Sequence, residues 1–166
     1  NIMQTVESIN HAVQILKQKT NLDIKEVCTG IAGQHIRSLQ HQDYITRENP
    51  EKFIDSHDVE LLHKNVKKLI LLPGEEIIHV LAQEYKIDGE TEIKQPEGMY
   101  GSRLEASFHI VAGQTAAIRN ITRCVITSGL KINPLNLEPL ASSDAVLSDD
   151  EKEAGVVLVD IAGGTT

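Results

Sequence analysis

The sequence predicts an α/β chain that carries a smaller α+β insert in its middle. Helically spaced apolar residues alternate with short apolar runs at both ends of the chain, a pattern typical of a sheet covered by helices. Between about residues 34 and 113, the order strand, helix, strand, strand is indicated, and the last strand alternates strictly between apolar and polar side chains. That alternation is typical of an antiparallel sheet with one covered face.

The composition indicates a globular chain and argues against nucleic-acid binding. The chain has 166 residues, of which 40% are hydrophobic, and its formal net charge is −8. The 16 basic residues are dispersed, 3% of residues are aromatic and Trp is absent, so neither a basic patch nor a base-stacking surface is indicated. No apolar run approaches the roughly 20 residues of a membrane helix. The sequence also shows no secretory leader.

The first predicted element is an amphipathic helix near the N-terminus. Its apolar face consists of Val6, Ile9, Val13 and Leu16. We expect this helix to end before Asn21 and to begin either upstream of Asn1 or at Thr5, whose hydroxyl is a candidate N-cap. Small residues over 26–33 then predict a short strand.

The insert begins with residues 34–49, which are mostly polar and predict an edge strand or a loop. A helix over residues 57–72 follows, with Asp55 or Ser56 as its N-cap and a stop at Pro73. Its predicted apolar face consists of Val59, Leu62, Val66, Leu69 and Ile70.

Two strands complete the predicted insert. Residues 76–89 are β-branched and apolar in their first half, and they predict a strand that leads into a long, glycine-rich connection. Residues 103–111 form the alternating strand. Its apolar face is Leu104, Ala106, Phe108 and Ile110, and its polar face is Arg103, Glu105, Ser107 and His109. We therefore expect a sheet with one covered face.

After the insert, helices and apolar strands return. Thr115 is a candidate N-cap of a helix that ends before Gly129, which has the position of a C′ glycine. Residues 130–140 predict a strand interrupted by proline, residues 141–147 a short helix, and residues 148–155 an acidic turn.

The strongest chemical signal is the C-terminal run VVLVDIAGGTT, residues 156–166. Its first four residues are continuously apolar and predict a strand that is buried on both faces and reaches Asp160. After such a strand, a Gly-Gly-Thr-Thr turn would present backbone N–H groups and hydroxyls to a phosphate, and the aspartate would hold a hydrated Mg²⁺. An ordinary tight turn beside a solvated aspartate explains the same residues equally well, so the spacing alone leaves both interpretations open.

Other reactive side chains form no recognisable site. Cys28 and Cys124 lie in separate apolar segments, and we expect both to be buried free thiols in a reducing compartment. The seven histidines lack metal-ligand spacing, although His79 and His109 would be neighbours if their strands pair. No nucleophile elbow, Walker-type lysine loop or dinucleotide fingerprint occurs, so no catalytic residue is predicted.

A surface for protein partners is a further hypothesis. Its candidate residues are Lys64, Lys67, Lys68, Arg103 and Glu105. The lysines come late in the predicted helix, where the helix dipole favours cations, and the other two residues lie on the polar face of the alternating strand. Alternatively, the helix and the strand cover each other and these charges are simply solvated.

Four stretches of the chain carry a family resemblance. They are GIAGQHI (30–36), IIHVLAQEYKIDG (77–89), GMYGSRLEASFHIV (98–111) and LEPLASSDAVLSDDEKEAGVVLVDIAGGTT (137–166). Together, and in this order, they resemble the FtsA family of bacterial actin-like cell division proteins. The HVL-QEY-IDG and G-RLEA stretches are specific to that family rather than shared by actin-like ATPases in general.

The resemblance implies the actin/Hsp70 ATPase fold with an extra subdomain, called 1C, that is placed differently from the one in actin. Residues 1–33 and 114–166 would be parts of subdomain 1A, and residues 34–113 would be 1C. It further implies a filament-forming protein that binds ATP and Mg²⁺, with weak or regulatory ATPase activity at most. Such a protein links the tubulin-like FtsZ to the cytoplasmic face of the membrane at the division site and recruits later division proteins. Subdomain 1C would mediate the contacts between protomers and with those partners.

The run DIAGGTT resembles the second phosphate motif of the family, with one departure. By this resemblance, Asp160 would contact Mg²⁺ through water. The residues that would approach the ATP phosphates are Gly163, Gly164, Thr165 and Thr166. The family has glycine where this chain has Ala162, and alanine is costly there if the backbone requires a positive φ.

A rival interpretation is a part of another actin-like ATPase, such as a pilus-assembly or chaperone-like protein, whose main output is ATP turnover. An insert that forms a subdomain of its own beside the core favours the FtsA interpretation. Strands that continue the core sheet favour the rival.

The chain begins at Asn1 and stops soon after a glycine pair, so we expect a piece of a longer protein. The family's first phosphate motif, adenosine motif, FtsZ-tail site and membrane helix do not occur within it. We therefore predict that these 166 residues alone are inactive and bind neither ATP, membranes nor the FtsZ tail tightly. Isothermal titration calorimetry measures the ATP affinity, and a micromolar value would contradict the expectation.

Overall fold

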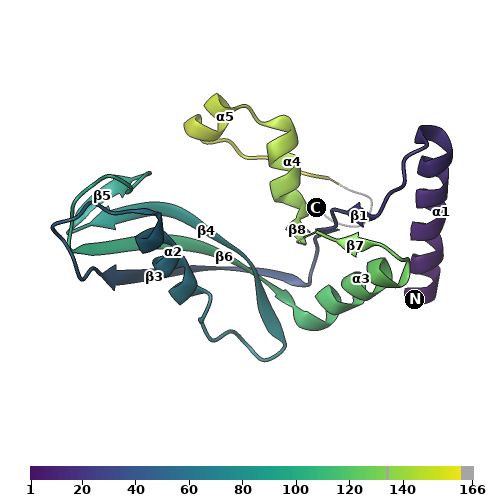
Figure 1. Ribbon diagram of the computed structural model, residues 1–166, viewed down its shortest axis with the longest axis horizontal. Helices are drawn as coiled ribbons and strands as arrows, with labels where there is room; N and C mark the ends of the chain where they lie inside the picture. Colours follow the sequence, from purple (N-terminus) through teal and green to yellow (C-terminus); the bar gives the residue numbers. More distant parts are fainter. Residues whose placement is uncertain (134, 162–166) are drawn as a thin grey trace. The chain divides into compact units, whose positions relative to one another are not determined.

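The computed structural model describes residues 1–133 and 135–161, which form two compact units (Figure 1). The terminal unit is built from both ends of the chain, residues 1–36 and the described residues from 114 onward. The middle unit consists of residues 37–113. Among the described residues, the strands of the two units belong to separate sheets.

The terminal unit combines helices with short parallel sheets, as predicted for an α/β chain. Its described elements are α1 (Ile2–Thr20), β1 (Glu26–Val27), β2 (Gly30–Ile31), α3 (Thr115–Thr127), β7 (Lys131–Ile132), β8 (Asn136–Leu137), α4 (Glu138–Val146) and α5 (Asp149–Ala154). Strand β1 pairs with β7 and β2 with β8, so segments from the two ends of the chain lie side by side. Helix α1 packs against α3, and α4 lies beside β2 and β8 (Figure 1).

The helix ends obey local capping rules, although not always at the predicted residues. The Asn1 side chain accepts a hydrogen bond from the Met3 N–H at 3.1 Å, so Asn1 rather than Thr5 is the N-cap of α1. Thr115 is the first residue of α3, and no side chain caps that helix. Gly129 follows α3 with a φ of 78°, as predicted for a C′ glycine.

Three further expectations for the terminal unit are wrong. Residues 149–154 form helix α5 rather than an acidic turn, because Ser148 and Glu151 form a capping box. The run 156–159 is not a buried strand: no described strand pairs with it, and Val157 is 90% exposed. Cys28 is exposed because it lies between the short strands β1 and β2, whereas Cys124 on α3 is buried.

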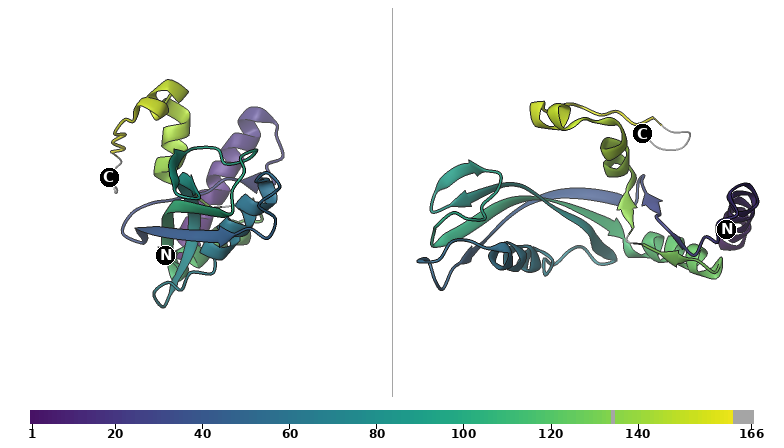
Figure 2. Two further views of the ribbon diagram at one scale, coloured as in Figure 1. Left: turned by 90° about the vertical axis from the view of Figure 1, so that its left-hand side faces the viewer. Right: turned by 45° about the horizontal axis from the view of Figure 1, so that its top comes forward.

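The middle unit is a four-stranded sheet with one helix on one face (Figure 2). Its elements are β3 (Ile36–Thr46), α2 (Ser56–Val66), β4 (Glu75–Ile87), β5 (Glu90–Ile93) and β6 (Arg103–Gln114). The strand order is β3-β6-β4-β5, and neighbouring strands run antiparallel (Figure 1). Strand β3 is therefore an edge strand, one of the two predicted possibilities for this segment.

The predicted order of strand, helix, strand, strand omits β5. Strands β4 and β5 form a hairpin through Asp88, with a φ of 47°, and Gly89, with a φ of 98°. Two positive φ values define a type I′ turn, for which Asp-Gly is a favoured pair. The Asp88 carboxylate also accepts hydrogen bonds from the backbone N–H groups of Ser102 and Arg103, both at 2.8 Å. These bonds attach the hairpin turn to the start of β6.

The core of the middle unit lies between α2 and the sheet. The predicted apolar face of β6 is confirmed, since all four of its side chains are buried. Helix α2 contributes Leu62 and Val66 to the same cluster, and the loop before the helix contributes Ile54. These side chains are completely or almost completely buried, and burying each aliphatic side chain contributes roughly 1.5–3 kcal/mol.

Helix α2 begins where predicted but ends earlier. Asp55 is its N-cap and forms a capping box with Asp58. The helix ends at Val66 rather than at residue 72, because the N–H groups of residues 68 and 69 bond to carbonyls three positions back, at 2.9 and 3.0 Å. Such bonds tighten and close the last turn. Ile70, which was predicted on the buried helix face, is consequently 95% exposed in the loop that follows.

Arg47 connects three segments at one end of the middle unit. Its guanidinium donates to the Asp58 carboxylate at 2.8 Å and to the carbonyls of Lys52, Phe53 and Gly101 at 2.9, 2.9 and 2.8 Å. The side chain is only 5% exposed. A guanidinium suits this position because its donors are held in a rigid planar fork.

His63 on α2 packs against the core of the sheet. Its ring meets Phe108 edge to face, with centroids 5.1 Å apart, and its Nε2 lies 3.2 Å from the Tyr85 hydroxyl. Burial lowers the pKa of His63 below its ordinary value of 6.5, and the charge of Lys67 lowers it further. Burial also raises the pKa of Tyr85, with a smaller contribution from the charge of Glu97.

We predict that Arg47→Met lowers the free energy of unfolding of the middle unit by about 3 kcal/mol, because Asp58 and three carbonyls lose a buried partner. Urea unfolding measures the change. Arg37→Met is the matched control: Arg37 pairs with Glu75 at 2.6 Å but on the surface, so its loss should cost much less than the loss of Arg47. Equal losses from both substitutions would contradict the role of Arg47.

We also predict that protonation of His63 destabilises the middle unit. Because its pKa is lower in the folded chain, the unfolded chain binds this proton first as the pH falls. The stabilisation is therefore complete above about pH 6.5 and is lost as the pH falls towards the lowered pKa. His63→Gln keeps a hydrogen-bonding group near Tyr85 and should flatten this loss in urea unfolding curves. The exposed His57 of the same helix provides the control, His57→Gln; if both variants kept the pH dependence of the parent, the prediction would be wrong.

Candidate interaction site

The five residues predicted to form an interaction surface lie on opposite faces of the middle unit. Lys64 is in the last turn of α2, Lys67 is the C-cap of that helix, and Lys68 follows. Arg103 and Glu105 lie on β6 and alternate with the buried residues of that strand, so they belong to the sheet face that α2 does not cover. The structure therefore does not bring these five residues together.

Arg103 and Glu105 are engaged within the open face of the sheet. The Arg103 Nε lies 3.0 Å from the Glu105 carboxylate, and the guanidinium carbon lies 3.7 Å from the centre of the Tyr44 ring on β3. Further hydrogen bonds between β3 and β6 join Gln40 to His109 and Gln42 to Ser107. This face is a row of cross-strand pairs, which leaves its charges little free capacity for a partner.

The three lysines at the end of α2 are followed by an exposed apolar loop. Residues 67–72, which we call the basic segment, combine two lysines with four aliphatic residues. Ile70 is 95% and Leu72 is 61% exposed. The ammonium groups of Lys64 and Lys67 form no ion pair or hydrogen bond with any described residue. Two exposed aliphatic side chains beside unpaired lysines make this loop a candidate surface for protein contact.

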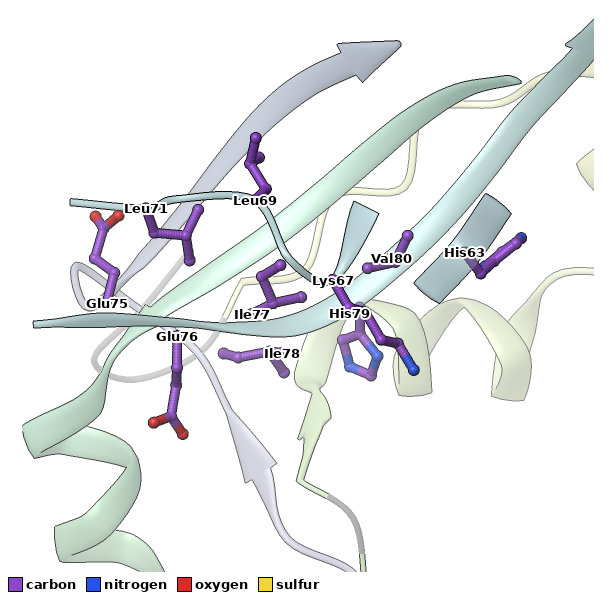
Figure 3. A pocket seen from close by; sticks show the side chains of 10 residues that line it. All are labelled: His63, Lys67, Leu69, Leu71, Glu75, Glu76, Ile77, Ile78, His79 and Val80. Carbon is purple, nitrogen blue, oxygen red and sulfur yellow. The ribbon is translucent and has the colours of Figure 1, made fainter. Parts of the chain in front are cut away.

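A cavity of about 700 Å³ lies between the basic segment and β4 (Figure 3). Its lining residues are His63, Lys67, Leu69, Leu71, Glu75, Glu76, Ile77, Ile78, His79 and Val80. In Figure 3, the two histidines and Lys67 lie towards one end of the cavity, and Glu75 and Glu76 lie towards the other. The cavity therefore separates its basic and acidic side chains.

The charges in this cavity are set by burial and by pairing. Burial lowers the pKa of His79, as it does that of His63, so both imidazoles are neutral at pH 7. The hydrogen bonds from Arg37 lower the pKa of Glu75 and hold its carboxylate. Lys67 is thus the positive charge beside the aliphatic walls. Such a cavity is suited to an apolar group that carries or adjoins a negative charge.

Neither a cluster of metal-ligating side chains nor a membrane-spanning helix is found among the described residues. Within residues 1–133 and 135–161, no group of three or more His, Cys, Asp or Glu side chains could hold a metal ion. In the same ranges, no helix is long and apolar enough to cross a bilayer.

One residue of the predicted phosphate motif is described. Asp160 is exposed, and its Oδ2 accepts a hydrogen bond from the Ser142 hydroxyl at 2.7 Å. The remaining predicted residues lie outside the described residues, namely Gly163, Gly164, Thr165 and Thr166, together with Ala162. Their role in phosphate binding stays a prediction.

Sequence analysis missed Ile70 and Leu72 as surface residues. They belong to an aliphatic run between two lysines and a Pro-Gly pair, and a helix face and an exposed loop both fit that pattern. Arg47 was missed as well, because its partners include a carbonyl 54 residues away. No local signal would have identified either feature.

The family model and the curated relatives point to one family. Residues 33–112 match the family model described as the SHS2 domain inserted in FtsA. The chain is 38% identical to cell division protein FtsA of Neisseria meningitidis serogroup B, over 100% of this chain and 40% of that protein. It is 40% identical to cell division protein FtsA of Pseudomonas aeruginosa, over 100% of this chain and 39% of that protein. The chain thus spans about 40% of the length of these curated relatives.

A solved structure with a similar arrangement is the PilM-PilN type IV pilus biogenesis complex. The TM-score is 0.46 at 13% identity, over 85% of this chain and 35% of that chain. A likeness of this size carries no argument about function.

The residues matched by the SHS2 model, 33–112, nearly coincide with the middle unit, 37–113. The antiparallel sheet with one covering helix is therefore the part of the chain that this model describes. The alignment with the two relatives extends over the terminal unit as well. The chain belongs to the FtsA family, and its middle unit is an SHS2 domain of that family.

Proposed function

We propose that this chain is the part of an actin-like bacterial division protein that carries its subdomain for protein contacts. In this proposal, the whole protein binds FtsZ, holds it at the cytoplasmic face of the membrane at the division site, and recruits later division proteins. The middle unit acts as subdomain 1C and mediates contacts between protomers and with partners. Residues 1–33 and 114–166 belong to subdomain 1A. The names of the relatives, cell division protein FtsA, support this role.

The observation that carries the proposal is the independence of the sheet in the middle unit. Among the described residues, its four strands pair with one another and with no strand of the terminal unit. An insert that does not extend the core sheet keeps a surface of its own for protein contacts. This favours a division protein over a pilus-assembly or chaperone-like ATPase whose main output is ATP turnover.

The proposal includes ATP and Mg²⁺ as ligands of the whole protein. Asp160 would contact Mg²⁺ through water, and residues 163–166 would approach the phosphates. The exposed Asp160 carboxylate receives its hydrogen bond at Oδ2, which leaves Oδ1 available to a metal-bound water. Nucleotide binding would regulate filament assembly, with weak ATP hydrolysis at most.

We predict that Lys64→Glu combined with Lys67→Glu in the whole protein reduces filament assembly or the recruitment of later division proteins about tenfold or more. Both side chains are exposed and without a charged partner among the described residues, so the fold should be kept. Attraction to an acidic partner would become repulsion. Electron microscopy of filaments and septal localisation of the later proteins measure the two effects.

The matched control is Lys19→Glu combined with Lys86→Glu, which makes the same charge change on α1 and β4. It should leave assembly and recruitment unchanged. If the Lys64 and Lys67 variant also left both unchanged, the lysine side of α2 would not be part of the interface.

A further inference from the structure

A second cavity lies at the N-terminal end of α2. Its volume is about 640 Å³, and its lining includes Phe53 and Tyr100, which are 56% and 66% exposed, and the partly exposed Leu61. Glu48 and Glu51 also line it, so we call it the acidic pocket. Exposed aromatic side chains around a hollow are typical of protein contact sites.

The acidic pocket has an excess of negative charge. The Glu48 and Glu51 carboxylates form no hydrogen bond or ion pair with any described residue. Arg47 lies in the wall, but four of its N–H groups already bind Asp58 and three carbonyls, so it does not neutralise the free carboxylates. Lys52 is the remaining lysine that lines the pocket. A cationic occupant is therefore favoured over a phosphate or a carboxylate.

The basic segment has the complementary chemistry. Lys67 has no charged partner among the described residues, and the Lys68 ammonium donates to the side-chain oxygen of Asn65 at 3.2 Å. The exposed Ile70 and Leu72 follow directly. Two cations followed by aliphatic side chains match a pocket that combines two free carboxylates with aromatic walls.

These two surfaces cannot meet within one molecule. Helix α2 has 11 residues and is about 16 Å long, and the pocket lies at its start while the basic segment begins at its C-cap. The segment is held at that end, since Leu69 and Leu71 line the cavity beside β4 (Figure 3) and the chain continues into β4 at Glu75. Contact between the two surfaces therefore requires two molecules.

We propose that the basic segment of one copy of the chain docks in the acidic pocket of a second copy. One copy contributes its basic segment and the other its acidic pocket, so the contact is heterologous. Repeated contacts would form a head-to-tail row with a free pocket at one end and a free basic segment at the other. The macrodipole of α2 accounts for acids at the start of the helix and lysines at its end. It does not account for the exposed Phe53, Tyr100 and Ile70, which docking would bury. The inference rests on the proposed self-association and assigns it to two surfaces of the middle unit.

Reciprocal charge reversal in the chain of residues 1–166 tests this contact. Glu48→Lys/Glu51→Lys makes the pocket basic, and Lys67→Glu/Lys68→Glu makes the segment acidic. Each double variant alone brings like charges together, so its self-association in sedimentation equilibrium should weaken about tenfold or more. An equimolar mixture of the two double variants pairs opposite charges again and should recover the association of the parent. The fourfold variant should recover it as well.

The matched control is Glu84→Lys/Glu90→Lys, which changes the charge equally on β4 and β5 and should associate like the parent. Circular dichroism checks the fold of every variant, and Glu48→Gln/Glu51→Gln removes the attraction without adding charge. The proposal is overturned by double variants that associate like the parent, by a mixture without recovery, or by a parent that stays monomeric at roughly 1 mM. Any of these results, together with an effect of Lys64→Glu/Lys67→Glu in the whole protein, would reject this contact and leave the proposed function standing.

Discussion

Four hydrogen bonds from the Arg47 guanidinium hold together the end of the middle unit at which α2 begins. They join the loop before the helix, the first turn of the helix and the connection into β6. Because the guanidinium is almost completely buried, its removal would take one hydrogen bond from each of these acceptors. The acidic pocket depends on the same bonds, since they fix the carbonyls of Lys52 and Phe53 and use up the cation that would otherwise oppose Glu48 and Glu51.

The length of α2 decides where the two charged surfaces lie. A capping box fixes the start of the helix at Asp55. Backbone hydrogen bonds between residues three positions apart end it after Val66. If the helix continued to residue 72, Leu69 and Ile70 would extend its apolar face. The early end instead places them in a loop, where Leu69 lines the cavity beside β4 and Ile70 is exposed. The early end of the helix therefore leaves Ile70, a residue of the expected core face, exposed on the surface, while Leu69 still packs against the core.

Periodicity predicted the elements whose pattern is local. The alternation of β6 specifies both the strand and its buried face, and the structure agrees. The helical spacing of α1 predicts the helix but only part of its buried face, since Val6 is buried whereas Leu16 is 48% exposed. The Asp-Gly turn before β5 and the capping box of α5 also have local signals, so these two elements were predictable and were missed. The aliphatic runs 69–72 and 156–159 have no such local signal. Whether an aliphatic run is buried depends on which other segment packs against it in the fold.

The two parts of the predicted interaction surface differ in the free energy that each could contribute to a contact. Arg103 and Glu105 already pair with each other on the open sheet face, and an exposed ion pair contributes only about 0–1 kcal/mol. Burying an exposed isoleucine side chain such as that of Ile70 in a contact contributes roughly 1.5–3 kcal/mol. The aliphatic side chains of the basic segment therefore supply most of the free energy of a contact, whereas its lysines select the partner surface and speed the encounter. Charge reversal on one surface introduces repulsion but leaves the apolar contact in place. A basic pocket should therefore bind an acidic segment as well as the acidic pocket binds the basic segment.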